Sequence, residues 1–90
     1  MNQAAADYLD LESEITWDGA ALSVWVRTAR GRIRCEIPRA TIHAVPPFSD
    51  VLGREIARDR VKIVDRMRPA LLRKVAATDG IVVQVNLNDL

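Results

Sequence analysis

The side chains best able to do chemistry in this sequence are one histidine, His43, and one cysteine, Cys35. A catalytic or metal-binding histidine needs partner ligands, and the residues after His43 offer none at helical spacing. Cys35 alternates with Ile33 and Ile37, which predicts a buried thiol rather than a nucleophile activated by a nearby cation. We therefore expect no catalytic residue, no bound metal and no cofactor.

Paired carboxylates and glycine-rich loops are the other common carriers of catalysis. Glu55 and Asp59 are spaced to share one side of a helix, but we expect them to be solvated. The four glycines are scattered and form no phosphate loop, and the sequence contains neither a nucleophile elbow nor an HExxH arrangement. The sequence therefore predicts that this protein is not an enzyme.

The strongest candidate for a binding site is an aromatic side chain among arginines. Trp25 shares one face of an alternating segment with Arg27, and Arg32 and Arg34 follow on the returning segment. Such a cluster can be held by cation–π contacts, worth about 0.5–1 kcal/mol, but it can also anchor a protein interface or stack a nucleic-acid base. All three roles stay open, although RNA-binding sheets usually present two or three aromatic residues.

Charge is balanced over the whole chain but strongly segregated along it. The 90 residues carry 13 basic and 12 acidic side chains, which argues against a strongly basic nucleic-acid domain. Residues 1–26 contain five carboxylates and no cation, whereas residues 27–39 contain five arginines against one glutamate. Residues 54–74 contain eight cations against three carboxylates. Either the acidic segment neutralises the basic ones, within the chain or in a symmetry mate, or the basic surface meets phosphate or an acidic partner.

Two alternating segments around a glycine-containing turn predict a β-hairpin over residues 21–27 and 32–37. Its apolar face comprises Leu22, Val24, Val26, Ile33, Cys35 and Ile37. The other face carries Trp25 and its arginines. A helix covers one of the two faces: if it covers the tryptophan side, the apolar side is left to meet another subunit.

The elements around the hairpin are marked by proline, glycine and capping residues. Residues 39–45 predict a short helical turn, and Ser49 or Asp50 can cap a helical region over residues 49–77. Pro69 predicts either a kink or a second helix that begins there. Asp79-Gly80 is typical of a left-handed helix end, and a strand is expected at residues 81–87.

These elements predict one α+β domain over residues 1–90. A small antiparallel sheet from residues 21–27, 32–37 and 81–87 packs on one long or kinked helix and one short helix. Residues 13–17 can add a further short strand. We expect residues 1–12 to form a mobile or irregular lead.

A series of short motifs carries a family resemblance: Trp17-Asp18, the glycine turn, Arg34-Cys35-Glu36-Ile37, the short helix at residues 40–42 and Asp79-Gly80. In this order they resemble the small bacterial family known as domain of unknown function 1488, over residues 9–88. Pro38 and the pair Pro46-Pro47 depart from the family pattern. The resemblance implies a compact α+β fold with an antiparallel sheet on helices, and it implies no activity.

We expect a non-catalytic cytoplasmic protein-interaction module that forms a homo-oligomer or binds another protein. A single cysteine suits a reducing compartment, and no apolar run approaches the roughly 18–20 residues needed to cross a membrane. The N-terminus also lacks the features of a secretory signal. The alternative is weak binding of nucleic acid or an acidic partner through the hairpin face, meaning Trp25, Arg27, Arg32 and Arg34, together with the basic helix.

Overall fold

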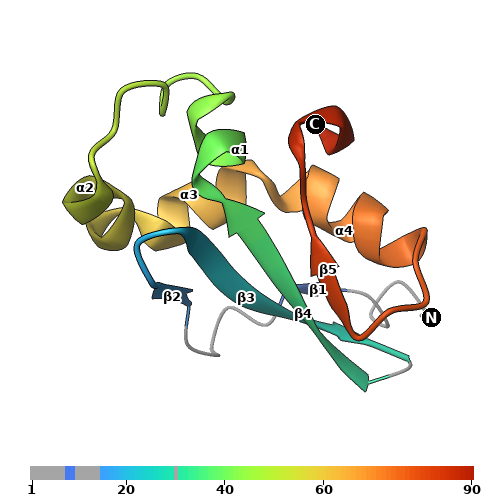
Figure 1. Ribbon diagram of the computed structural model, residues 1–90. Helices are drawn as coiled ribbons and strands as arrows, with labels where there is room; N and C mark the ends of the chain where they lie inside the picture. Colours follow the sequence, from blue (N-terminus) through green and yellow to red (C-terminus); the bar gives the residue numbers. More distant parts are fainter. Residues whose placement is uncertain (1–7, 10–14, 30) are drawn as a thin grey trace.

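The alternating segments form the predicted β-hairpin at the centre of the fold (Figure 1). The computed structural model describes residues 8–9, 15–29 and 31–90. Within it, β3 (Ala21–Thr28) and β4 (Gly31–Pro38) pair antiparallel, with Val24 opposite Cys35. Gly31 has a φ of 110°, a left-handed conformation that favours glycine, so the glycine of the predicted turn is needed there.

Two short strands line the outer edge of β3. β2 (Thr16–Trp17) pairs with its first half and confirms the extra strand expected in this region. β1 (Tyr8–Leu9) pairs with its second half and was not predicted, and the remainder of the expected lead lies outside the described residues. The turn from β2 into β3 is held by Asp18, whose Oδ1 accepts the N–H groups of Ala20 and Ala21 at 2.8 and 2.9 Å.

The C-terminal strand corrects the prediction of an antiparallel sheet. β5 (Val82–Gln84) runs parallel to β4, with Cys35 opposite Val83, so the sheet is mixed and has the order β1-β3-β4-β5. A parallel neighbour needs a crossover connection, and the helices between β4 and β5 supply it. Alternation of apolar residues reports which face is buried and carries no information on strand direction, so the sequence pattern was compatible with both. β5 is also shorter than the predicted strand, and a 3₁₀ turn, η2 (Leu87–Asp89), follows it.

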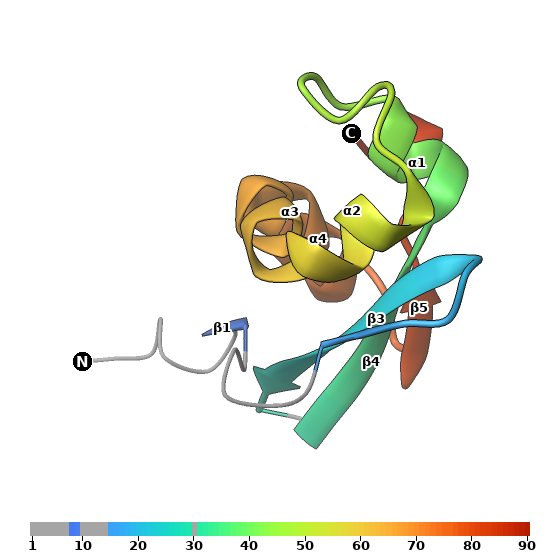
Figure 2. The same cartoon turned by 90° about the vertical axis from the view of Figure 1, so that its left-hand side faces the viewer.

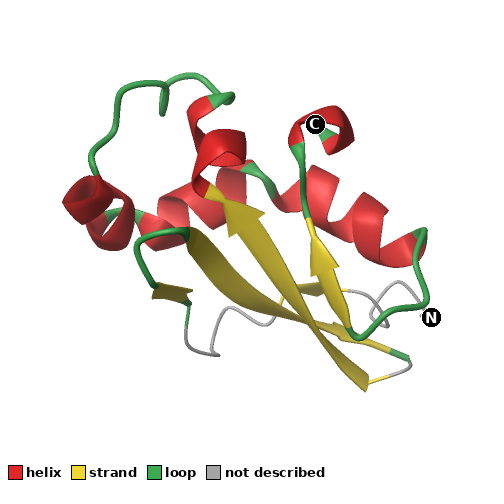
Figure 3. Cartoon of the chain, viewed as in Figure 1, coloured by secondary structure: helices red, strands yellow, loops and turns green. Residues whose placement is uncertain are grey.

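The region predicted as one long or kinked helix is divided into three segments (Figure 3). These are α2 (Gly53–Arg58), α3 (Arg60–Arg66) and α4 (Arg68–Ala76). Pro69 lies in the first turn of α4, where backbone N–H groups have no partner within the helix and the missing N–H of proline costs nothing. A second helix therefore does begin there, as one of the two alternatives predicted. The break at Asp59 was not predicted. Asp59 leaves helical geometry with φ −102° and ψ 21°, although its carbonyl still accepts the N–H of Ile63 at 2.9 Å.

Both predicted helix caps are wrong, whereas the short helix is confirmed as α1 (Arg39–His43). α2 begins beyond Ser49 and Asp50, because the preceding loop first carries Phe48 into the core, and Glu55 accepts the N–H of Leu52 at 2.7 Å. At the other end of the helical region, the φ of Gly80 is not positive, so Gly80 does not form the predicted left-handed helix end.

The helices lie on one face of the sheet, over the apolar side of the hairpin (Figure 2). The six apolar hairpin residues are each at most 2% exposed. They pack against Ile42 of α1 and against a stripe of buried apolar residues along α2, α3 and α4, namely Ile56, Ile63, Val64, Met67, Leu71 and Val75. The idea that a helix covers the Trp25 side is therefore wrong: no described helix lies on that face.

Candidate interaction surfaces

The four residues of the hairpin face are brought together by the pairing of β3 and β4. Trp25 lies opposite Arg34, and Arg27 lies opposite Arg32. The guanidinium carbon of Arg32 is 4.7 Å from the centroid of the Trp25 ring, which is a close cation–π contact. Trp25 is half-buried, whereas Arg27 and Arg32 are exposed. The predicted cluster thus exists on the side of the sheet away from the helices.

Arg34 is engaged within the same strand. Its Nη2 donates to Oε2 of Glu36 at 2.8 Å, and the two side chains are 43% and 30% exposed. Its Nε is buried without a hydrogen-bond partner among the described residues. Arg32 lies over the ring of Trp25, and Arg34 pairs with Glu36. These side chains of the hairpin face therefore already contact one another.

The free side of β5 forms an open sheet edge. The N–H of Arg34 donates to the carbonyl of Ile81 at 3.0 Å, and the N–H of Val85 donates to the carbonyl of Glu36 at 2.9 Å. Since backbone groups alternate in direction along a strand, those of Val82 and Gln84 point away from β4. No further strand among the described residues pairs with them.

The side chains at this edge are unusually apolar. Ile81 is 77% exposed and Val82 is 51% exposed. Natural sheet edges are commonly protected by charged residues, proline or a bulge. None of these occurs over Ile81–Gln84, and the only protective feature of this edge is that β5 is a short strand. The opposite edge of the sheet is occupied by β1 and β2.

A groove of about 260 Å³ lies between β2 and the α2–α3 junction. This Trp17 groove is lined by Ile15, Thr16, Trp17, Ala57 and Arg60. Arg60 is fixed at its rim, because Nη1 donates to the carbonyl of Ala57 at 2.8 Å, an oxygen that the helix break at Asp59 leaves available. The guanidinium carbon of Arg39 lies 6.0 Å from the Trp17 ring centroid.

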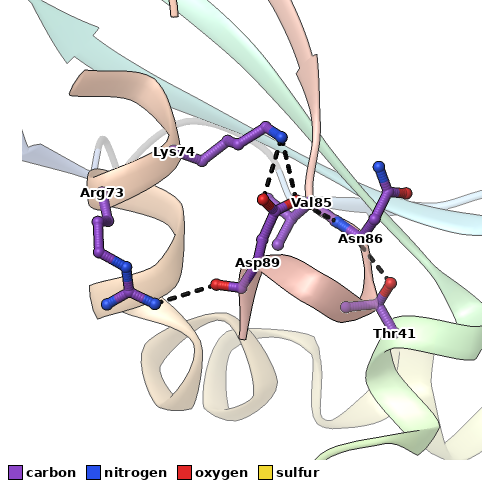
Figure 4. A network of polar contacts seen from close by, with 6 residues as sticks. All are labelled: Thr41, Arg73, Lys74, Val85, Asn86 and Asp89. Carbon is purple, nitrogen blue, oxygen red and sulfur yellow. Dashed lines mark hydrogen bonds and ion pairs between the residues drawn. The ribbon is translucent and has the colours of Figure 1, made fainter. Parts of the chain in front are cut away.

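A cavity of about 430 Å³ lies between α4 and η2, with its charged groups paired to one another (Figure 4). Nζ of Lys74 lies 3.1 Å from both carboxylate oxygens of Asp89, and Arg73 donates to the Asp89 carbonyl at 3.0 Å. The pKa of Asp89 is lowered mainly because its carboxylate accepts the N–H of Asn86, and to a smaller extent because Lys74 donates to it. Beside this network, the Thr41 hydroxyl donates to the carbonyl of Val85 at 2.9 Å. The arrangement fastens the C-terminal segment to α4 and α1.

The two residues considered first for chemistry have structural surroundings. Cys35 is fully buried, and burial raises the pKa of its thiol to about 12. His43 lies in α1 with Nε2 3.1 Å from the Val51 carbonyl, a contact that ties α1 to the loop before α2. The described residues contain no group of three side chains able to hold a metal ion, and none of their helices is long and apolar enough to cross a bilayer.

The sequence did not predict the Trp17 groove or the open edge of β5. Trp17 was interpreted only as the end of a short strand and as part of the Trp17-Asp18 motif, and no spacing rule connects it with Arg39 and Arg60. Trp17 lies beside both arginines because β2, α1 and α3 approach one another at one end of the sheet (Figure 1). The exposed Ile81-Val82 pair was a usable signal, since it begins the last strand without a charged residue.

Comparison of the chain with protein-family models, curated proteins and solved structures found no match. The resemblance to domain of unknown function 1488 therefore stays a prediction, and function has to be inferred from the surfaces of the molecule itself.

Proposed function

We propose that this protein is a non-catalytic interaction module that self-associates by pairing the open edge of β5 with the same edge of a second copy. The observation that carries this proposal is an edge strand with unpaired backbone groups and two exposed β-branched side chains, Ile81 and Val82. Edges of this kind are templates for another strand, because the added strand satisfies the backbone and covers the side chains together.

A two-fold axis at Val82 gives the most favourable register. Two copies related by such an axis pair antiparallel, and each Val82 exchanges both backbone hydrogen bonds with Val82 of the second copy. Ile81 then lies opposite Val83 of the second copy on the helix side of the sheet. This register places the two most exposed apolar side chains of the edge against apolar neighbours.

Electrostatics do not oppose this arrangement. Arg34 is the basic residue that lies opposite Val82 on β4. The two copies of Arg34 would be separated by three strand spacings, or about 14 Å, which exceeds the Debye length of about 8 Å at physiological ionic strength. Their repulsion is therefore largely screened.

The alternative of a nucleic-acid or acidic partner on the hairpin face has weaker support. Arg32 lies over the ring of Trp25 and Arg34 pairs with Glu36, so a ligand there would compete with existing contacts. The backbone groups at the β5 edge have no such competitor among the described residues.

The proposal is tested by measuring mass against concentration, by light scattering or sedimentation, for the wild type and for Val82→Lys. The wild-type mass should rise towards that of a dimer with increasing concentration. Val82→Lys places two ammonium groups beside the axis, so dimerisation should weaken at least about tenfold.

Val82→Thr is the matched control, because it keeps a β-branched side chain of similar shape and adds no charge. It should dimerise nearly as the wild type does, and circular dichroism should show that both variants stay folded. A wild-type mass that stays monomeric at every concentration, or equal dimerisation of the lysine and threonine variants, would refute pairing through β5.

A further inference from the structure

The geometry points to a second docking site, in which the Trp17 groove binds a segment of a partner protein that carries an apolar side chain next to a carboxylate. This site is separate from the β5 edge and does not depend on self-association. Residues of β2 line one side of it, and residues of the α2–α3 junction line the other.

The apolar component of the site is larger than the groove itself. Trp17 is half-buried, Ile15 is buried, and Ala57 of α2 lines the groove with them. Val61 lies next to Arg60 at the start of α3 and is 52% exposed, so the described residues leave an apolar side chain uncovered beside the groove. Gly53 precedes Ala57 by one turn, and a Cβ added there would lie 3.6 Å from Nε1 of Trp17, in ordinary van der Waals contact, so small residues border the indole.

The charged component is defined by two arginines, Arg39 and Arg60, for which the described part of the chain supplies no carboxylate partner. Arg39 lies over the ring of Trp17, and Arg60 is anchored at the rim through the Ala57 carbonyl. Neither of them forms an ion pair with any described residue. Other arginines of the helical region do form ion pairs: Arg58 with Asp59 at 3.0 Å and Arg68 with Asp65 at 2.8 Å.

Charge complementarity therefore selects a carboxylate-bearing occupant, and the apolar lining selects an adjacent hydrophobic side chain. The volume of about 260 Å³ is below the roughly 300–1,000 Å³ of typical small-molecule pockets, and it suits one or two side chains of a peptide. A nucleic-acid base is a poorer fit, because the guanidinium carbon of Arg39 lies over the ring on which a base would stack, 6.0 Å from its centroid.

The site can be tested by fluorescence. Trp25→Phe leaves Trp17 as the only tryptophan, so its emission reports the groove directly. The probe is a short peptide in which leucine alternates with glutamate. Two matched peptides replace either every glutamate by glutamine or every leucine by serine. The titration is repeated with Val82→Lys added, which separates this site from any effect of self-association.

The alternating peptide should change the Trp17 emission saturably, and both matched peptides should bind more weakly. Arg60→Gln and Arg39→Gln should each raise Kd by roughly threefold to fivefold, the range expected for loss of one exposed ion pair. Lys62→Gln is the control, since Lys62 is an exposed cation of α3 that does not line the groove, and it should change Kd by less than about twofold.

Three outcomes would overturn the proposal. The first is unchanged Trp17 emission up to about 1 mM peptide, which corresponds to negligible affinity. The second is equal binding of the glutamine peptide, which would show that the arginines do not select charge. The third is displacement of the peptide by a single-stranded oligonucleotide at lower concentration, which would assign the groove to nucleic acid. Arg39→Gln keeps the test valid if Arg60→Gln disturbs the helix junction.

Discussion

Cys35 occupies the middle of β4, and its thiol is fully enclosed between the sheet and the helices. Burial raises the pKa of this thiol to about 12, from an ordinary value of 9.0. At pH 8 only about one thiol in ten thousand is therefore ionised in the folded protein. The reactive-looking residue of the sequence is thus held in its unreactive form, as its alternation with isoleucines suggested.

The first prediction concerns this thiol. The folded protein should react with a thiol reagent at least about a hundredfold more slowly than the protein in denaturant, because reaction requires opening of the core. The unfolded thiol ionises near pH 9, whereas the folded one stays neutral up to about pH 12. The free energy of unfolding should therefore fall as pH rises between these values.

Cys35→Ala is the control for this effect, since it removes the titrating group. Its free energy of unfolding should lack the component of the alkaline slope that comes from the thiol. Rapid labelling of the native wild type at pH 8 would show that the thiol is accessible.

At the scale of elements, Pro69 marks the start of α4 and does not disturb it. Pro69→Ala should therefore change stability by less than about 1 kcal/mol, because no helical N–H is missing at this position. Leu72→Pro places proline inside α4 and should cost about 3 kcal/mol more than Leu72→Ala, which corrects for the lost side chain. Urea unfolding measures both differences, and a large gain from Pro69→Ala would mean that proline strains the helix.

The elements also show what the sequence could predict. The hairpin, α1 and the buried helical stripe were predictable, because alternation and helical spacing are local signals. The direction of β5 was not, since the same alternation suits both orientations, and the break at Asp59 carries no proline or glycine to mark it. For the sites, Trp25 and Arg32 could be paired from the hairpin alone. Trp17, Arg39 and Arg60 are far apart in sequence and meet only through tertiary packing.

At the scale of the whole molecule, the C-terminal segment is held by one buried hydrogen bond and one charged network. Thr41 is 2% exposed, and its hydroxyl supplies the Val85 carbonyl with a partner. Thr41→Val should cost about 1–3 kcal/mol of unfolding free energy, because that carbonyl stays buried without a donor. Thr41→Ser keeps the hydroxyl and should cost less. Denaturant titration measures the free energy of unfolding of both variants. Equal decreases in the two would show that the hydrogen bond contributes nothing to stability.

The parallel pairing of β4 with β5 has a consequence for how the chain folds. β3 and β4 are neighbours in sequence, so their pairing closes only a short loop, whereas Cys35 and Val83 must meet across all the intervening helices. Closing a longer loop costs more chain entropy, and non-local pairing slows folding. We therefore expect the hairpin to form early and β5 to dock last. Until β5 docks, the edge of β4 is exposed. Incompletely folded chains should therefore associate through β4, whereas native copies associate through β5.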